Sequence, residues 1–225
     1  MTMAKQAILM FHGIGEPPTN IPPAEVPYWI TDSFFDEIVG YARSRHSGPE
    51  IVFTFDDGNE SDVAAARKLS EVGLKGQFFV LAGRLESPGY LDRSDLLILD
   101  DLEMEIGLHG THHVDWRRAS QAELIDETVT SRKTIADVVG KPITSLAIPF
   151  GAYNKPVLRY LESQNFDRIY LADNGLATAG SKYLRRNPVM GWQTISHIDD
   201  YVEDRASLLT KVRRKLMPLL KRQLA

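Results

Sequence analysis

Short apolar runs alternate with segments of helical periodicity along most of the chain. Runs rich in β-branched and aromatic residues predict strands at residues 7–11, 51–55, 76–81, 105–108, 144–148 and 168–172. Apolar residues recur at helical spacing between these runs, which predicts helices over residues 31–44, 61–73, 120–140 and 154–164. This rhythm favours an α/β fold with a parallel sheet, open or closed into a barrel.

Two of the predicted helices carry clear boundary signals. Ser120, with Glu123 three residues later, forms the sequence pattern of a capping box. Gly140 ends the same helix close to where its apolar period stops. Asn154, two residues before a proline, begins the next helix.

Polar side chains follow the predicted strands at the point where each one ends. They are His12 after the first strand, Asp56 and Asp57 after the second, His109 and His113 after the fourth, and residues 149–151 after the fifth. The carboxyl ends of parallel strands share one edge of a sheet or one rim of a barrel, where such folds build active sites. We therefore expect these residues to converge in space.

Asp56 and Asp57 are adjacent carboxylates that repel each other when both are ionised, and a bound cation would offset that repulsion. His109 and His113 are four residues apart, so one helical turn, or a tight turn leading into a helix, can aim both imidazoles at one ion. With Asp57 as the oxygen ligand, this set is typical of catalytic Zn2+, although cobalt, nickel or iron would also suit it. Asp56 stays free to accept a proton from the attacking water.

Three motifs occur in an order and spacing that resemble one family. They are "TFDDG" at residues 54–58, "EIGLHGTHH" at 105–113 and "LAIPFGAYN" at 146–154. Over residues 7–189 or so, the chain resembles the polysaccharide deacetylases with a NodB homology domain, carbohydrate esterase family 4. The resemblance implies a distorted (β/α) barrel of about seven parallel strands in a single domain.

The same resemblance implies roles for individual residues. Asp56 would be the catalytic base, and Asp57, His109 and His113 would be the metal ligands. The backbone N–H of Phe150 would help to hold the tetrahedral oxyanion.

The "PFG" motif and nearby aromatic residues provide the candidates for substrate binding. We expect Pro149 and Gly151 to contact the substrate, together with Tyr153 and Trp116. An aromatic ring can stack on a sugar, although aromatic residues in loops more often serve packing. The other aromatic residues with this potential are Tyr28, Trp29 and Trp192.

The general acid has two candidates in the sequence. The family usually carries this His in a C-terminal L-x-H strand, and no convincing copy follows Ala172. The N-terminal "AILMFHG" is instead similar to a circularly rearranged branch that acts on exported poly-N-acetylglucosamine. We therefore expect His12 to be the acid, with His197 in "TISHIDD" as its rival.

Two positions depart from the family pattern. Ala147 stands where the family often has an Arg that orients the base, and Arg185 or Arg186 could replace it. Gly110 stands where a Ser or Thr hydroxyl usually steadies the metal loop. Neither departure removes a metal ligand.

Composition indicates a cell compartment, and the charged residues are unevenly distributed along the chain. The 225 residues are 43% hydrophobic and 25% charged, without Cys, and the N-terminal apolar run is too short for a signal segment, so we expect a cytoplasmic protein. The net charge is −4, which disfavours nucleic acid as a partner, yet residues 205–225 hold seven basic residues and no acidic one. We expect a deacetylase domain over residues 1–204 and a basic helix over 205–225. That helix either docks on the barrel or lies on an anionic membrane.

Together these features predict a metal-dependent hydrolase that removes an N-acetyl group from an amino-sugar substrate, either a polymer or a carrier-linked precursor. One alternative is a deformylase of a lipid-linked amino sugar or an amidohydrolase of a small cyclic amide. Another is an inactive metal- or glycan-binding module. The sequence leaves the metal, the sugar and the oligomeric state open.

Overall fold

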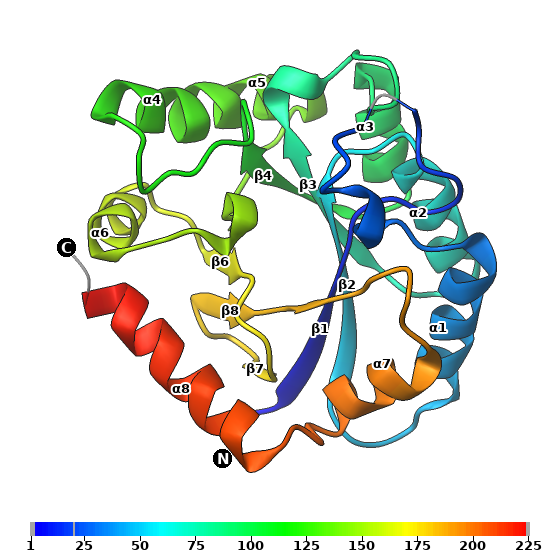
Figure 1. Ribbon diagram of the computed structural model, residues 1–225. Helices are drawn as coiled ribbons and strands as arrows, with labels where there is room; N and C mark the ends of the chain where they lie inside the picture. Colours follow the sequence, from blue (N-terminus) through cyan, green and yellow to red (C-terminus); the bar gives the residue numbers. More distant parts are fainter. Residues whose placement is uncertain (1–2, 20, 224–225) are drawn as a thin grey trace.

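A nearly closed barrel of mostly parallel strands forms the centre of the protein, with helices around its outside (Figure 1). The structure is a computed structural model that describes residues 3–19 and 21–223, so the last two residues of the basic segment lie outside the described residues. The strands follow one another in the sheet in the order β7-β1-β2-β3-β4-β5-β6-β8, and β9 pairs with β1. Their bounds are Lys5–Phe11 (β1), Glu50–Asp57 (β2), Gly76–Leu81 (β3), Glu105–Gly110 (β4), Ser145–Ala147 (β5), Arg168–Leu171 (β6), Ala177–Thr178 (β7), Tyr183–Arg185 (β8) and Asn187–Pro188 (β9).

Strand direction agrees with the prediction of about seven parallel strands. The strands β1 to β6 and β8 run parallel to their neighbours, β9 is parallel to β1, and β7 is antiparallel to β1. The predicted barrel and single α/β domain are therefore confirmed. The sequence did not predict β7, β8 and β9, because two or three residues are too few to show an alternating pattern.

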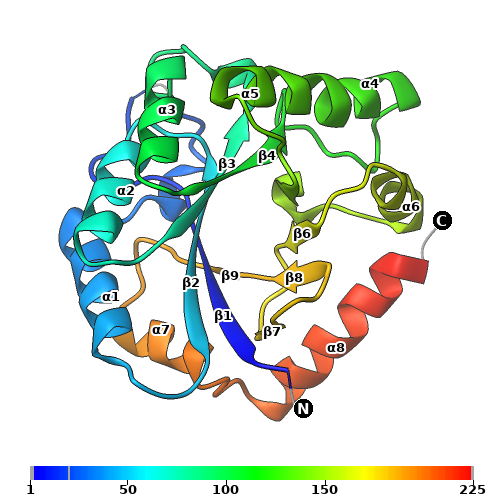
Figure 2. The same cartoon turned by 180° about the vertical axis from the view of Figure 1, so that it is seen from behind.

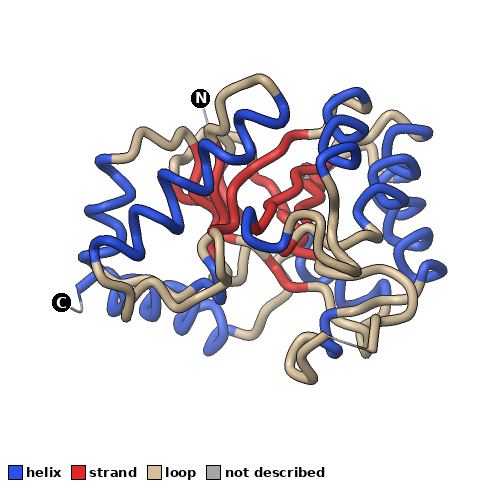
Figure 3. The backbone as a smooth tube through the Cα atoms, turned by 90° about the horizontal axis from the view of Figure 1, so that it is seen from above, coloured by secondary structure: helices blue, strands red, loops and turns tan. Residues whose placement is uncertain are grey.

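The helices cover the outer face of the barrel, which Figure 2 shows from behind and Figure 3 from above. Their bounds are Asp32–Ser44 (α1), Asp62–Glu71 (α2), Arg93–Asp101 (α3), Gln121–Ile125 (α4), Ser131–Val139 (α5), Lys155–Ser163 (α6), Ile195–Val202 (α7) and Leu208–Gln223 (α8). A π-helical turn, η3 (Asp126–Thr130), joins α4 to α5, and shorter helical turns occupy Val26–Tyr28 (η1), Ala82–Arg84 (η2) and Pro149–Gly151 (η4). The sequence patterns did not predict α3 or α7.

The predicted helix boundaries are confirmed in detail. Ser120 and Glu123 form a reciprocal capping box, and Gly140 adopts the left-handed conformation at the end of α5. The side chain of Asn154 accepts a hydrogen bond from the backbone N–H of Val157.

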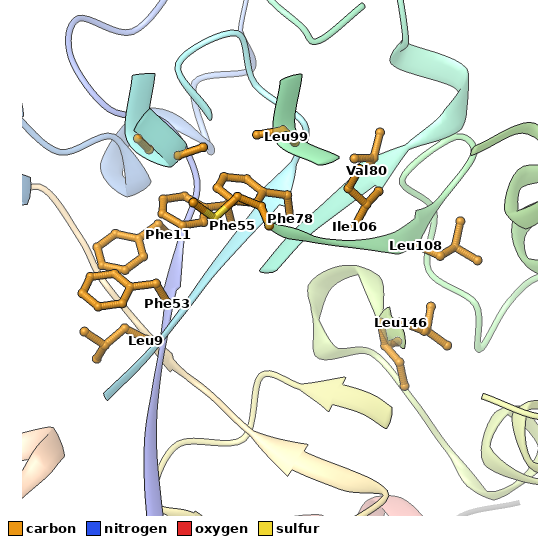
Figure 4. Packing of buried hydrophobic residues seen from close by; sticks show 14 of the residues in the cluster. Leu9, Phe11, Phe53, Phe55, Phe78, Val80, Leu99, Ile106, Leu108 and Leu146 are labelled. Carbon is orange, nitrogen blue, oxygen red and sulfur yellow. The ribbon is translucent and has the colours of Figure 1, made fainter. Parts of the chain in front are cut away.

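Alternation along the strands divides the core into two parts. Leu9, Phe11, Phe53 and Phe55 point outward and pack with residues of the surrounding helices in the main hydrophobic cluster (Figure 4). The alternate positions point into the barrel, where a smaller cluster gathers. Its members are Ile8, Phe79, Ala147, Tyr170, Ala177 and Leu184. By the same alternation, Thr54 and Asp56 of β2 lie inside the barrel between the outward-facing phenylalanines.

No helix within residues 3–19 and 21–223 has the length and apolar character needed to cross a membrane.

Candidate active site

The carboxyl ends of the central strands open into one pocket, a cavity of about 550 Å³. Several residues singled out in the sequence line it: His12, Asp56, Asp57, His109, His113, Phe150 and Gly151. The strands β2 and β4 carry the two aspartates and His109, and His12 directly follows β1. The residues at the strand ends therefore converge, as expected.

Asp56 is held inside the barrel by an arginine that replaces the one expected at Ala147. The Arg186 guanidinium donates to both carboxylate oxygens, from Nη1 to Oδ1 at 2.6 Å and from Nη2 to Oδ2 at 2.8 Å. Both side chains are buried. Burial alone would raise the pKa of Asp56, but the charge and hydrogen bonds of Arg186, with help from His109, lower it to about 2. Asp56 is therefore ionised throughout the neutral range.

Asp57 reaches the same pocket because its backbone leaves the strand conformation. A residue next to an inward-facing Asp56 would face outward in a regular strand, yet Asp57 has φ +78° and its carboxylate lines the cavity. Its Oδ1 lies 3.5 Å from His109 Nε2 and 3.6 Å from His113 Nε2. One ligand atom from each of these three residues lies within 4.8 Å of the others, so they form a candidate metal site.

The protonation of this group suits metal binding. The Nδ1 atom of His109 lies 2.9 Å from the carbonyl oxygen of Ala147, and a hydrogen bond there leaves Nε2 free to face Asp57. Burial lowers the pKa of His109 to about 3, and it also lowers the pKa of His113. Both imidazoles are therefore neutral, which is the form that ligates metal.

A divalent ion fits these residues for a further reason. Among the described residues, nothing donates a hydrogen bond to the buried Oδ1 of Asp57. Burial raises the pKa of Asp57 to about 6, with a smaller contribution from the charge of Asp56. A buried carboxylate oxygen without a partner is costly, and a cation at this point would satisfy it.

The spacing of His109 and His113 does not correspond to a helical turn, so that alternative of the prediction is wrong, and a turn after the strand brings the two imidazoles together instead. His109 belongs to β4, and His113 lies in the loop that follows, with φ +53°. The Phe150 ring packs on the His113 imidazole, with ring centroids 4.2 Å apart. Phe150 itself has φ +56°, and its side chain is exposed at the mouth of the pocket.

A buried glutamate in η3 fastens the loop that carries His113. Glu127 accepts hydrogen bonds from the backbone N–H groups of Thr111 at 3.0 Å and His112 at 2.9 Å. It also accepts one from Trp116 Nε1 at 3.1 Å. A Cβ on Gly110 would lie 2.3 Å from Glu127 Oε2. Glu127 thus does the steadying that a Ser or Thr hydroxyl does in the family pattern, and the absence of a side chain at Gly110 makes room for it.

The two candidate acids lie in different places. His12 lines the pocket with its ring against Tyr28, at a centroid distance of 4.7 Å. Burial lowers the pKa of His12, opposed by the charges of Asp57 and Asp56. His197 belongs to α7, where its Nδ1 accepts from the backbone N–H of Thr194 and its ring packs against Trp192. The geometry therefore favours His12.

Two aromatic residues predicted to contact substrate do not line the pocket. Trp116 and Tyr153 are each only 1% exposed, so neither ring offers a face to a sugar. Trp116 is fixed by Glu127, and the Tyr153 hydroxyl donates to Asp173. From the "PFG" motif, Gly151 lines the pocket, whereas Pro149 is buried and does not line it.

The pocket wall also contains residues that the sequence analysis left out. Arg84 and Glu25 line it and form an ion pair of 3.6 Å, and Glu25 Oε1 lies 3.9 Å from His113 Nδ1. Arg84 follows β3 at its carboxyl end, so the argument from strand ends could have found it. Glu25 precedes a short helical turn, where no pattern in the sequence marks it.

Comparison with known proteins agrees with this site and fold. Residues 43–169 match the family model for polysaccharide deacetylase, and the chain belongs to that family. Over 112 residues it is 30% identical to the peptidoglycan-N-acetylglucosamine deacetylase PgdA of Listeria monocytogenes. That match covers 48% of this chain and 22% of the relative, so the chain spans less than a quarter of the length of the curated relatives it matches.

Solved structures share the fold at low sequence identity. BC0361, a polysaccharide deacetylase from Bacillus cereus, matches with a TM-score of 0.77 and 15% identity, over 89% of this chain and 69% of that one. The deacetylase PplD from Streptococcus pyogenes matches with a TM-score of 0.76 and 19% identity, over 89% and 99%. IcaB from Ammonifex degensii matches with a TM-score of 0.64 and 17% identity, over 84% and 93%.

Proposed function

We propose that the protein is a metal-dependent hydrolase that removes an N-acetyl group from an amino-sugar substrate. The observation that carries the proposal is that two adjacent buried carboxylates have different partners. Asp56 is paired with Arg186, whereas Asp57 faces two neutral imidazoles. Membership of the polysaccharide deacetylase family and the similarity to PgdA support this choice of substrate class.

Asp57, His109 and His113 would hold the ion. When bound there, a divalent ion such as Zn2+, Co2+ or Ni2+ lowers the pKa of the attacking water and polarises the amide carbonyl. A base as weak as Asp56 then suffices to accept the proton. Arg186 holds both oxygens of Asp56 in a fixed orientation, so the base needs no reorganisation when the proton moves.

The remaining steps use Phe150 and His12. The backbone N–H of Phe150, in the turn that lines the pocket, donates a hydrogen bond to the carbonyl oxygen as its charge grows. As the carbon–nitrogen bond breaks, His12 gives a proton to the departing nitrogen, which leaves acetate and a free amino sugar. Burial lowers the pKa of His12, which makes its imidazolium a stronger acid, while the neighbouring charges of Asp57 and Asp56 oppose that shift and favour the protonated ring.

The test is acetate release from N-acetylglucosamine oligomers by zinc-loaded protein, with the variant Asp56→Asn beside the wild type. We expect the variant to lose about 10²–10⁴-fold in rate while its zinc content, measured by elemental analysis, stays the same. Asp137→Asn, at an exposed position of α5, is the matched control and should keep the wild-type rate.

Two results would change the proposal. A rate near wild type in Asp56→Asn would show that another group is the base. Formate release from an N-formyl amino sugar, without acetate release from the oligomers, would keep the base and replace the acyl group.

A further inference from the structure

The basic face of the C-terminal helix α8 is turned towards the rest of the protein. Lys211 and Arg214 pair with Asp204, in the turn between α7 and α8, at 3.2 and 3.0 Å, and Lys221 reaches Asp173, which follows β6, at 2.8 Å. Pro218 lies on the same face and is buried. Positions 211, 214, 218 and 221 follow helical spacing, so one face of α8 makes these contacts.

The apolar residues of α8 lie on the opposite face, which is exposed. Leu209 is 83% exposed, Leu216 53% and Leu220 51%. The other exposed residues of this stripe are Leu208, Val212 and Leu219. An ordinary surface helix buries its apolar face and exposes its charges, whereas α8 does the reverse. Figures 1 and 2 both show the helix at the periphery of the molecule.

A contiguous stripe of exposed leucines needs an explanation, because such patches mark interaction surfaces. We propose that the apolar face of α8 lies in the surface of an anionic phospholipid bilayer. An interfacial helix of this kind inserts its apolar residues at the level of the headgroups and is held there by flanking cations.

The charge of α8 favours a bilayer over a second copy of the chain as the partner of its apolar face. Residues 208–223 contain no Asp or Glu, and Arg213 is exposed beside the leucine stripe. Two copies packed through this face would bring like charges together, and neither helix has an acidic residue to pair with them. Anionic headgroups supply that opposite charge.

The attachment of α8 also brings its C-terminal end close to the pocket. Lys221 Nζ donates to the carbonyl oxygen of Gly151 at 3.3 Å, and Gly151 lines the active-site cavity. The C-terminal end of the helix therefore contacts a residue of the pocket wall.

The test is co-sedimentation of the full chain with vesicles of phosphatidylglycerol and phosphatidylcholine, compared with pure phosphatidylcholine. We expect the wild type to bind the anionic vesicles and added salt to weaken that binding. The triple variant L209Q/L216Q/L220Q should lose about tenfold or more in affinity for the anionic vesicles. Glutamine is a good helix former, so the fold should persist, and circular dichroism checks it.

The matched control is L97Q/I125Q/V129Q, which removes three half-exposed apolar residues, 43–47% exposed, from elements other than α8. It should bind vesicles like the wild type. Equal vesicle binding by both triple variants, or none by the wild type, would overturn the proposal. A dimer in light scattering that L209Q/L216Q/L220Q converts to a monomer, with no vesicle binding, would assign the face to a second copy instead. Neither readout depends on deacetylase activity, so the two proposals can fail separately.

Discussion

Asp56 and His113 face the same pocket from supports of different kinds. Asp56 belongs to β2, which pairs with β1 over residues 50–55 and with β3 over residues 53–57. His113 belongs to a loop, and the buried carboxylate of Glu127 holds the backbone just before it. The strand side of the pocket is thus placed by many backbone hydrogen bonds, whereas the loop side is held by a few contacts, among which Glu127 makes the largest number.

The two sides also balance their charge differently. On the strand side, Arg186 neutralises Asp56 through two charge-assisted hydrogen bonds. On the loop side, Asp57 and His113 face each other across a gap that a cation would fill. Damage to the strand side should therefore appear as lost stability, and damage to the loop side as lost metal affinity.

Removing the partner of Asp56 is expected to have the largest effect. Arg186→Met leaves a buried carboxylate without its counter-charge, which costs about 3–5 kcal/mol of unfolding free energy. Urea unfolding measures the loss. Arg185→Met, at the neighbouring half-buried position, is the control and should cost less than about 1 kcal/mol.

A double variant makes this prediction sharper. Combining Arg186→Met with Asp56→Asn removes the buried charge together with its partner, so we expect it to recover part of the lost stability. Equal destabilisation by Arg186→Met and Arg185→Met would show that the ion pair does not support the fold.

Loosening the loop side is expected to weaken metal binding. In Glu127→Gln, a neutral amide replaces the carboxylate that accepts three N–H groups, so His113 is placed less firmly. Changes of this kind typically cost 10- to 100-fold in metal affinity, or about 1–3 kcal/mol. Calorimetric titration with Zn2+ measures the affinity.

Asp126→Asn provides the matched control for the loop. Asp126 is adjacent to Glu127, but its side chain pairs only loosely with the exposed His112, at 3.3 Å. The Zn2+ affinity of the Asp126→Asn variant should equal that of the wild type. If Glu127→Gln also binds Zn2+ like the wild type, the loop does not depend on this carboxylate.

The same contrast explains what could be predicted from the sequence. Alternation and strand ends were enough to bring His12, Asp56 and His109 to one pocket, because a parallel sheet fixes where its strands end. Arg186 could not be separated from Arg185, because the choice depends on the register of the three-residue strand β8.

Tertiary context decides the features that the sequence could not give. Glu127 looks like an exposed residue of a helix, but the π-helical turn η3 accompanies its burial under the metal loop. Trp116 and Tyr153 looked available for stacking, since a loop sequence does not say which way its aromatic rings turn. The amphipathic period of α8 predicted a helix, but not that its basic face would be the attached one.

Gly110→Ala tests the packing between the two sides, and its expected effect on stability is smaller than that of Arg186→Met. The new Cβ meets Glu127 Oε2 at 2.3 Å, and φ at Gly110 is +101°. Gly140→Ala is the matched control, because Gly140 also has positive φ, +69°, while a Cβ there meets nothing within 4 Å in the described part of the chain. We expect about 1 kcal/mol of lost unfolding free energy at Gly140 and about 2 kcal/mol at Gly110. In a Glu127→Ala background the clash with Glu127 is gone, so the cost of Gly110→Ala should fall towards that of Gly140→Ala. If it does not fall, backbone strain alone keeps glycine at this position, and room for the Glu127 carboxylate is not the reason.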